Sequence, residues 1–588
     1  MRCGTSFYNG TLGKQLTLRF WPLIALYSVI WAMFLPFVAI TSPTPVPDTW
    51  ESAESILSSV KYFFQWVPLF LAVGFGVLVA MAVCSHLYST RSANFTAALP
   101  PKRTAMFATH YLTGLLWLVV PFLVMAVLAM GIYQVKLQDF TAVFQVFGPG
   151  MAMGMGMLLF FYSFAVLCGM LTGHLLALPV FYAIFNGLVG GIWLLLTAIF
   201  QEFYYGYPGS VSVIPAWVEW LTPAWNLLRQ FLTPEGISPA VVAVYAVVGA
   251  LMALVAGLLY LKRPMERAGD VVIWAGLRPV FRYGVALCSG LALGSLTRIV
   301  LNLGPLGLAV SAILWGVAGC FVAQMFLTKS VRVLRYWKGA GAVAVSFAAL
   351  FGVIQLDLTG YETRVPAPDN VVSVSISGLD SLPRDTASSF LHISTSDSEA
   401  ISLVTQLHQQ LVDLGPIDVI YGEEYFDSTS LDVTYTLANG TRISRSYLVP
   451  LYVEEERQPG TITYLAHEIV NNRDLMLQSY LFPQMEKNGY RLTGVELYEE
   501  YAVDSSSLSA SEARKVYKAV LQDIQEGNLP HGLFEYDNIV MRLDLRWISP
   551  DINSASYYGT SSSDIYYINV CLTEQAEHTL KVLEELGY

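Results

Sequence analysis

The sequence predicts an α-helical transmembrane bundle of about nine spans, followed by a C-terminal extracellular α+β domain. The composition is 54% hydrophobic and only 13% charged, with a mean hydropathy of +0.51, which excludes an ordinary soluble protein. Nine apolar runs approach the length of about 20 residues that crosses a bilayer. The charge changes sign along the chain: residues from Asp357 onward carry 14 basic and 35 acidic side chains, whereas the remainder carries 19 and 9.

The first expected element is an interfacial helix within residues 1–19, where apolar and polar side chains are mixed and the segment ends on Lys14 and Arg19. A disordered tail is the alternative. A six-span domain (20–261) and three additional spans (262–356) follow. The nine runs lie at about 20–41, 66–87, 106–131, 146–172, 176–200, 239–261, 283–301, 307–327 and 339–356.

Basic residues set the expected orientation. With the N-terminus in the cytoplasm, inside segments hold 15 Lys and Arg residues and outside segments hold four. This asymmetry follows the positive-inside rule. Because nine is an odd number, the C-terminal domain is expected outside the cell. The positive charge of the membrane half therefore belongs to topology and predicts no nucleic-acid partner.

A polar loop between the second and third runs, Tyr88–Arg103, is the expected contact with a separate protein. It combines positive charge with two apolar side chains, which suits docking on an acidic protein surface or on anionic lipid headgroups. An ordinary positive-inside loop without a partner is the alternative. The residues expected to take part are Arg91, Phe95, Leu99, Pro100, Lys102 and Arg103.

The outside segment 201–238 is too apolar for a free loop, and Pro215 and Pro223 divide it into two short helical pieces. Such pieces are expected at the membrane surface or partly within it, with tryptophans at headgroup level. A lid packed on the bundle is the alternative. The residues that indicate outer helices are Trp217, Trp220, Trp225 and Phe231.

Small residues recur at four-residue spacing within the spans and predict close helix packing. These pairs are Gly150/Gly154, Gly187/Gly191 and Gly290/Gly294.

After a linker (357–370), residues 371–588 alternate strand and helix patterns. Two capping boxes, Ser396–Glu399 and Ser509–Glu512, each precede apolar residues at helical spacing. Asn439-Gly440 predicts a hairpin. The repeated pattern indicates two related units, 371–450 and 505–588, and a last helix (573–586) is expected to be capped by Thr573.

No catalytic, cofactor or metal motif occurs in the sequence, so the chain is not expected to be an enzyme. It has no Gly-x-x-x-x-Gly-Lys-Ser/Thr loop for ATP. The C-terminal histidines show no metal spacing and are expected to be surface or helix residues; they are His408, His467, His531 and His578. Ionisable residues are nearly absent from mid-span, which disfavours an ion-coupled secondary carrier.

The N-terminal stretch resembles the permease subunits of ABC-2-type transporters from Gram-positive bacteria, and the likeness covers about residues 5–261. It is carried by Phe7-Tyr8-Asn9, the segment Leu18–Leu23, Trp31 and Leu35-Pro36. In that family the interfacial helix, the basic loop and the two outer helices correspond to the elbow helix, the coupling helix and the re-entrant outer helices.

This resemblance implies a transport subunit in the bacterial cytoplasmic membrane. A separate cytoplasmic ABC ATPase would bind ATP and magnesium, and a second permease copy or homologue would complete the transporter. The three additional spans and the outer domain depart from the six-span pattern and resemble an extended form, which leaves the substrate open. The alternative is a membrane-anchored sensor or scaffold whose extracellular domain binds a ligand or partner.

Overall fold

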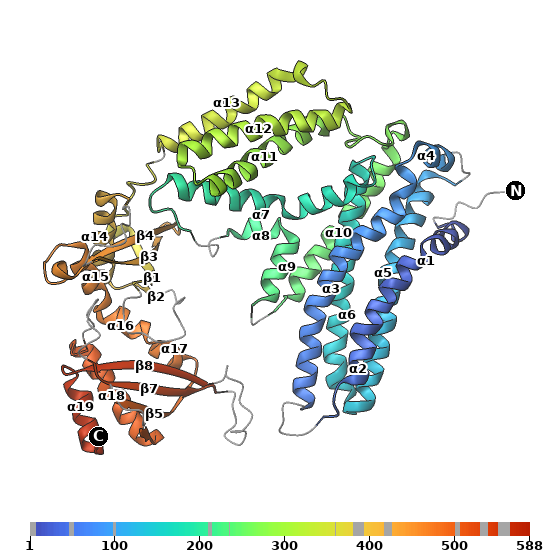
Figure 1. Cartoon of the computed structure of the whole chain (residues 1–588). Helices are drawn as coiled ribbons and strands as arrows, with labels where there is room; N and C mark the ends of the chain where they lie inside the picture. Colours follow the sequence, from blue (N-terminus) through green and yellow to red (C-terminus); the bar gives the residue numbers. More distant parts are fainter. Residues whose placement is uncertain are drawn as a thin grey trace. The chain divides into compact units, whose positions relative to one another are not determined.

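The structure is a computed structural model, and it divides into two compact units (Figure 1). The first unit is Met1–Leu196 with Val211–Phe351, and the second is Thr197–Ser210 with Gly352–Tyr588. The structure describes residues 8–45, 52–97, 101–209, 214–233, 236–358, 360–379, 393–416, 426–499, 506–529, 539–550 and 565–588.

The first unit is helical, and the described residues of the chain contain nine helices long and apolar enough to cross a membrane. This confirms the predicted number of spans and the multi-pass character. Several helices extend beyond the run that predicted them, because backbone hydrogen bonding continues into polar residues. The spans are α1 (Gly10–Ala32) continued by η1 (Met33–Phe37) and α2 (Val38–Thr41), α3 (Ala53–Cys84) with η2 (Ser85–Leu87), α5 (Arg103–Leu137), α6 (Phe140–Leu171), α7 (Ala177–Phe203), α10 (Pro239–Lys262), α11 (Leu277–Leu301), α12 (Pro305–Thr328) and η5 (Leu334–Tyr336) with α13 (Trp337–Gln355).

α1 is interrupted at Phe20, whose φ of −110° and ψ of 18° are not helical. Pro22 follows two residues later, and proline both lacks an N–H and crowds the preceding turn, which explains a bend at this point. The part of α1 before the bend falls within the predicted interfacial segment. Asn9 caps it, and the Asn9 N–H donates to Thr109 Oγ1 of α5 over 2.9 Å.

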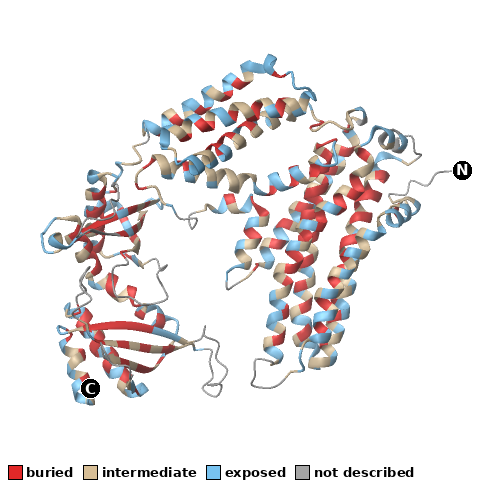
Figure 2. Cartoon of the chain, viewed as in Figure 1, coloured by how far each residue is buried: buried red, intermediate tan, exposed pale blue. Residues whose placement is uncertain are grey.

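Two of the three glycine pairs allow close packing, and the third does not. An added Cβ at Gly150 would lie 2.5 Å from the Phe64 ring, and one at Gly294 would lie 2.8 Å from the backbone of α12. Figure 2 shows buried residues along α3 and α6, where the first pair lies. Around Gly187 and Gly191 no described atom comes within 4 Å of an added Cβ. The packing prediction is therefore wrong for this pair.

The second unit contains two four-stranded antiparallel sheets with the same topology. The strand orders are β2-β1-β3-β4 and β6-β5-β7-β8, and one helix follows the second strand of each. The first module comprises β1 (Val371–Gly378), β2 (Ile393–Thr395), α14 (Ser398–Leu414), β3 (Phe426–Leu437) and β4 (Arg442–Tyr452). The second comprises β5 (Arg491–Glu499), β6 (Ser506–Leu508), α18 (Ala510–Glu526), β7 (Ile539–Ile548), β8 (Ile565–Thr573) and α19 (Glu577–Leu586).

The sequence pattern put the start of the second repeated unit at residue 505. The repeated topology instead places the first strand of the second module, β5, before that residue. β5 was missed because a bulge between Leu492 and Gly494 breaks the alternation of apolar and polar residues. The Asn439-Gly440 hairpin between β3 and β4 is confirmed. Between the modules lie η7 (Val453–Glu455), α15 (Ile462–Val470), α16 (Arg473–Ser479) and α17 (Phe482–Lys487).

Helix caps in the second unit follow the sequence signals in part. The Ser509–Glu512 capping box is present at α18. At α14 the cap is Asp397, not Ser396, and its carboxylate accepts the Ala400 N–H. Thr573 ends β8 and does not cap α19, which begins four residues later.

The free N–H groups at the N-terminus of α19 instead donate hydrogen bonds to a buried carboxylate of α18. Asp523 is 0% exposed and accepts hydrogen bonds from the His578 N–H (3.1 Å) and the Thr579 N–H (2.7 Å). The Thr579 hydroxyl donates to the same carboxylate over 2.6 Å. Acceptors near a helix N-terminus satisfy its free N–H groups and complement the helix dipole. This tertiary cap explains why α19 starts where it does.

The end of α7 belongs to the second unit and is attached to its first sheet through Tyr204–Tyr207, here called the tyrosine clasp. The Ser446 N–H donates to the Gly206 carbonyl over 3.1 Å, and the Tyr205 N–H donates to the Glu362 carboxylate over 2.8 Å. The Tyr205 ring lies 5.1 Å from the Tyr447 ring. The clasp thus joins a membrane-length helix to β4.

The predicted linker is also held on the second unit. The Tyr361 ring lies 5.2 Å from that of Tyr204 and 3.8 Å from the guanidinium of buried Arg445. Arg445 donates to the Tyr361 carbonyl over 2.8 Å. The described part of the linker therefore packs against the tyrosine clasp and against Arg445 of β4.

His408 lies on α14 inside the core of the first module. It is 1% exposed, and its ring nitrogens form hydrogen bonds with the hydroxyl groups of Tyr435 (3.2 Å) and Tyr447 (2.9 Å). Burial lowers the pKa of His408 to about 4, and the charge of Arg445 contributes in the same direction. A buried neutral histidine thus connects the core to the tyrosine clasp.

Candidate functional site

The candidate site is built around α4 (Thr90–Ala97), a short helix that lies between α3 and α5. Ser92 holds its start, because the Ser92 hydroxyl donates to the carbonyl of His86 over 2.9 Å and to that of Ser89 over 3.1 Å. Arg91 is exposed, and Phe95 is 69% exposed. A large apolar side chain next to a cation is thereby presented away from the bundle.

The remaining predicted loop residues have different positions. Leu99 and Pro100 lie outside the described residues. Lys102 is exposed and precedes the first turn of α5. Arg103 is exposed too, but its Nη1 donates to the Leu261 carbonyl near the end of α10 over 3.1 Å. Arg103 therefore links α5 to α10 as well as carrying charge.

A second segment lies beside α4 and was not singled out from the sequence. This segment, residues 263–276, contains η4 (Met265–Arg267), which contacts α4. Arg263 is only 2% exposed and donates to two carbonyl groups at the end of α6, those of Gly169 and Thr172, over 2.9 Å each. The Tyr88 hydroxyl also donates to the Gly169 carbonyl, over 3.2 Å. Sequence reasoning counted Arg263 only as positive-inside charge.

The turn between α6 and α7 is held by the same segment. The Gly173 N–H donates to the Asp270 carbonyl over 2.8 Å, and the Gly269 N–H donates back to Gly173 over 2.8 Å. The Asp270 carboxylate forms ion pairs with Lys329 (2.7 Å) and Arg278 (3.4 Å). One segment therefore connects α4, the α6–α7 turn, α11 and the α12–α13 connection.

The rings of two histidines, one in η2 and one in α5, are in contact close to the start of α4. The ring centroids of His86 and His110 are 4.1 Å apart, and each Nδ1 lies 2.9 Å from a carbonyl of its own helix. The Nε2 of His86 is buried and has no hydrogen-bond partner among the described residues. His110 lies near the start of α5, where the hydropathy signal gave no reason to single it out.

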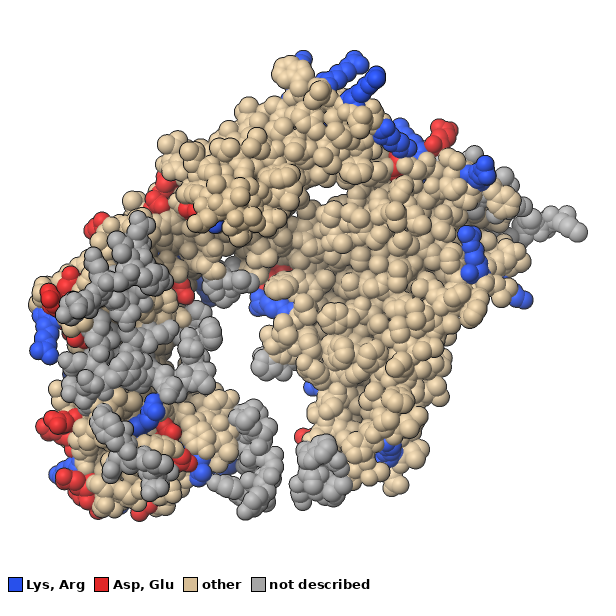
Figure 3. Space-filling view, in the orientation of Figure 1, with Lys and Arg blue, Asp and Glu red and all other residues tan. Residues whose placement is uncertain are grey.

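Positive charge gathers at this end of the first unit, here called the α4 end. Figure 3 shows blue side chains along the upper right edge, over the region that carries α4 in Figure 1. Only Asp270 and Glu266 supply acidic groups on the described segment between α10 and α11. The exposed basic residues of this end include Arg91, Lys102, Arg103, Lys262, Lys329, Arg332, Arg335 and Lys338.

The two short helices expected in segment 201–238 are present as α8 (Ala216–Trp220) and α9 (Pro223–Phe231). They pack on the bundle through buried Leu227 and Asn226, and the Asn226 amide donates to the Tyr245 hydroxyl of α10 over 2.9 Å. Arg229 and Glu219 form an ion pair between the two helices.

The tryptophans of these two helices are exposed, whereas Phe231 contacts the bundle. Trp217 is 56% exposed, Trp220 41% and Trp225 39%. Phe231 lies 4.9 Å from the ring of Tyr62 on α3. The segment thus has a packed side and an aromatic exposed side.

Comparison with known proteins finds no matching family model, no similar curated protein and no similar solved structure.

Proposed function

We propose that this chain is the permease subunit of an ATP-binding-cassette transporter of the ABC-2 type, with α4 as the docking helix for a separate ATPase. The observation that carries the proposal is α4 itself. It is a short helix between the second and third spans, it exposes Phe95 beside Arg91, and it is attached to the bundle at its base. Docking surfaces commonly combine one apolar anchor with flanking charge.

The contacts beneath α4 support a role in transmitting movement. A displacement of α4 acts on His86 through Ser92 and on η4 through direct contact. From there, Arg263 and Asp270 connect to α6, α7, α11 and the α12–α13 connection. A rigid chain of hydrogen bonds and ion pairs of this kind can couple ATP binding on a partner to helix rearrangement.

In this proposal the α4 end faces the cytoplasm of a bacterial cell and the second unit lies outside. The partner ATPase binds ATP and magnesium, and a second permease copy or homologue completes the transporter. The transported substrate enters through the bundle, and the outer modules contact substrate or another surface component.

Co-purification from native membranes tests the docking helix. Phe95→Ala and Arg91→Glu should each weaken capture of the ATPase subunit by about tenfold or more, because an anchor residue contributes about 2 kcal/mol to an interface. Matched controls at the same end are Val331→Ala, 80% exposed, and Lys338→Glu, also exposed. The controls should retain capture. Unchanged capture by the α4 variants, with normal membrane insertion, would show that α4 is not the docking helix.

A second candidate function is a membrane-anchored sensor or scaffold. The tyrosine clasp favours it, because ligand binding by the second unit would act directly on the end of α7. Capture of a ligand by the second unit without any associated ATPase would support this function over transport.

A further inference from the structure

The connection between α12 and α13 lies beside the membrane because of its place in the chain. α12 ends at Thr328, and the next candidate span begins with η5 at Leu334. Residues 329–333 alone join the two helices, so this short link cannot extend far from the bilayer surface. Val333 is 2% exposed and fixes the link on the first unit.

Basic and apolar residues recur with a period of three through this connection. The basic residues, all exposed, are Lys329, Arg332, Arg335 and Lys338. The Tyr336 N–H donates to the Val333 carbonyl over 2.9 Å, which is the bond of a 3-10 turn, and in such a turn residues three apart lie in line. Arg332, Arg335 and Lys338 are here called the cationic row, and the residues one position before them, Val331, Leu334 and Trp337, the apolar row.

The apolar row continues an exposed side of α13. Val331 is 80% exposed, Leu334 77% and Trp337 65%. Further along α13, Gly341 and Val345 are exposed at helical spacing from Trp337. The exposed apolar side of a span faces acyl chains, and tryptophan is enriched where acyl chains meet headgroups. The positive-inside rule accounts for the cations of this connection, but not for exposed apolar side chains beside them.

The charge of the cationic row is not compensated within the described part of the chain. Lys329 pairs with Asp270 over 2.7 Å, and Asp270 also pairs with Arg278 over 3.4 Å. The cationic row forms no ion pair with a described carboxylate. Figure 3 shows blue side chains at the top of the view, where α12 and α13 join in Figure 1. Anionic lipid headgroups complement this charge, whereas zwitterionic headgroups carry no net charge.

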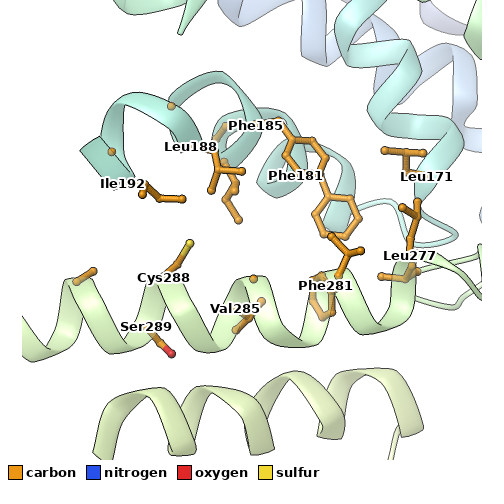
Figure 4. A pocket seen from close by; sticks show the side chains of 18 of the residues that line it. Leu171, Phe181, Phe185, Leu188, Ile192, Leu277, Phe281, Val285, Cys288 and Ser289 are labelled. Atoms are coloured by element: carbon orange, nitrogen blue, oxygen red, sulfur yellow. The ribbon is translucent and has the colours of Figure 1, made fainter. Parts of the chain in front are cut away.

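The same connection is one of the points at which the last three spans are fastened to the first six, through the ion pair with the segment 263–276. Phe181 and Phe281 form another contact, with ring centroids 5.7 Å apart, and beyond them an apolar groove lies between α7 and α11 (Figure 4). Gly187 and Gly191 face this groove, and no described atom lies within 4 Å of a Cβ added at either. An anchor at the α12–α13 connection therefore helps to fix spans that the groove leaves partly separate from α7.

We propose that the α12–α13 connection anchors the first unit to an anionic membrane surface in the leaflet at the α4 end. The cationic row binds lipid phosphates, and the apolar row inserts among the headgroups. The occupant is lipid and not a protein, because the link is held at the bilayer surface and its apolar row is continuous with the exposed side of a span. This inference holds whether or not the chain is a transport subunit.

Photo-crosslinking of the full chain tests the anchor. The protein is reconstituted in phosphatidylcholine vesicles with a minor fraction of a phosphatidylglycerol that carries a diazirine at the headgroup end of one acyl chain. A phosphatidylcholine with the same diazirine is the reference probe, and labelled peptides are mapped by mass spectrometry. Residues 329–338 should be labelled preferentially by the phosphatidylglycerol. The preference should fall as the salt concentration is raised, because salt screens exposed charges.

Substitutions separate the contributions of the two rows. Arg332→Gln with Arg335→Gln and Lys338→Gln should reduce the preference on the order of a hundredfold, since each cation near an anionic surface contributes about fivefold. Val331→Ser with Leu334→Ser should instead reduce labelling by both probes, because the link no longer inserts among the headgroups.

The matched control removes the same number of exposed charges elsewhere in the first unit. Lys14→Gln with Arg19→Gln and Lys262→Gln should leave the labelling of residues 329–338 unchanged. Two outcomes would overturn the proposal. Equal labelling by the two probes at low salt would show an ordinary interfacial loop without preference for anionic lipid. A protein crosslinked to residues 329–338 in native membranes, in place of lipid, would show that a protein partner covers the connection.

Discussion

At the scale of single residues, the buried polar side chains of this protein join elements that are distant in sequence. Arg263 joins the end of α10 to the end of α6, Asp523 joins α18 to α19, and His408 joins α14 to β3 and β4. Each makes specific hydrogen bonds that offset the cost of burial. Removal of one partner therefore costs more than the bond alone, because the other group stays buried.

His408 gives the first module a pH-dependent stability. In the unfolded chain His408 takes up a proton near pH 6.5, whereas the folded pKa is about 4. Between these values the unfolded state binds more protons, so stability is full above pH 6.5 and falls as the pH drops towards 4. The difference between the two pKa values corresponds to a loss of about 3 kcal/mol in the free energy of unfolding. Hydrogen exchange of residues 398–414, corrected for intrinsic rates, should report it.

His408→Gln is the matching variant, since a neutral amide keeps donor and acceptor capacity without a proton to gain. It should flatten the pH dependence. His578→Gln, at a half-buried histidine paired with Glu526, should leave the first module unchanged. An unaltered pH profile in His408→Gln would assign the dependence to another group.

At the scale of elements, short connecting pieces carry the specific contacts, whereas long helices carry the packing. α4, η4 and the tyrosine clasp are each fewer than ten residues, and each fastens two larger elements. Their own hydrogen bonds are too few to make them stable in isolation. Their geometry is therefore set by the partners that hold them.

A substitution at Gly206 tests whether the tyrosine clasp stabilises β4. Its φ of +76° is left-handed, and a Cβ there would lie 2.4 Å from the Tyr447 ring. Gly206→Ala should cost about 1–2 kcal/mol for the backbone and a further 1–3 kcal/mol for overpacking. Hydrogen exchange of β4 should speed up accordingly.

Gly460→Ala is the control for backbone strain alone. Its φ of +89° is equally left-handed, but no described atom lies within 4 Å of an added Cβ. If both variants changed the exchange of β4 equally, the Tyr447 contact would contribute nothing to the clasp.

At the scale of the whole molecule, charge separates along the chain. The residues from Asp357 onward have a net charge of −21, while the remainder has +10. The described acidic half forms two modules of repeated topology, and the basic residues of the other half gather at the α4 end. The division of charge along the sequence thus coincides with the division of the described chain into nine candidate spans and two sheet modules.

Cysteine labelling of intact cells tests the orientation. Glu454→Cys and Lys338→Cys introduce thiols at exposed positions of the second unit and of the α4 end. A membrane-impermeant maleimide should label the first in intact cells and the second only after permeabilisation. The unaltered chain controls for its native cysteines. Labelling of both in intact cells would contradict the nine-span orientation.

Much of the fold was predictable because its signals are local. Hydropathy over about 20 residues located all nine candidate spans, and the Asn439-Gly440 and Ser509–Glu512 signals located a hairpin and a helix start. Such features depend on residues within one or two turns of each other.

The sequence by itself therefore determined the membrane character, the division of charge and the positions of the spans. Only the tertiary structure decided that Asp523 caps α19, that Arg103 bonds the end of α10, and that Gly187 and Gly191 face an open groove. These outcomes depend on which distant elements meet. Identical small-residue spacing on α6, α7 and α11 leads to packing or to a groove according to the neighbour present, and spacing along one helix carries no information about that neighbour.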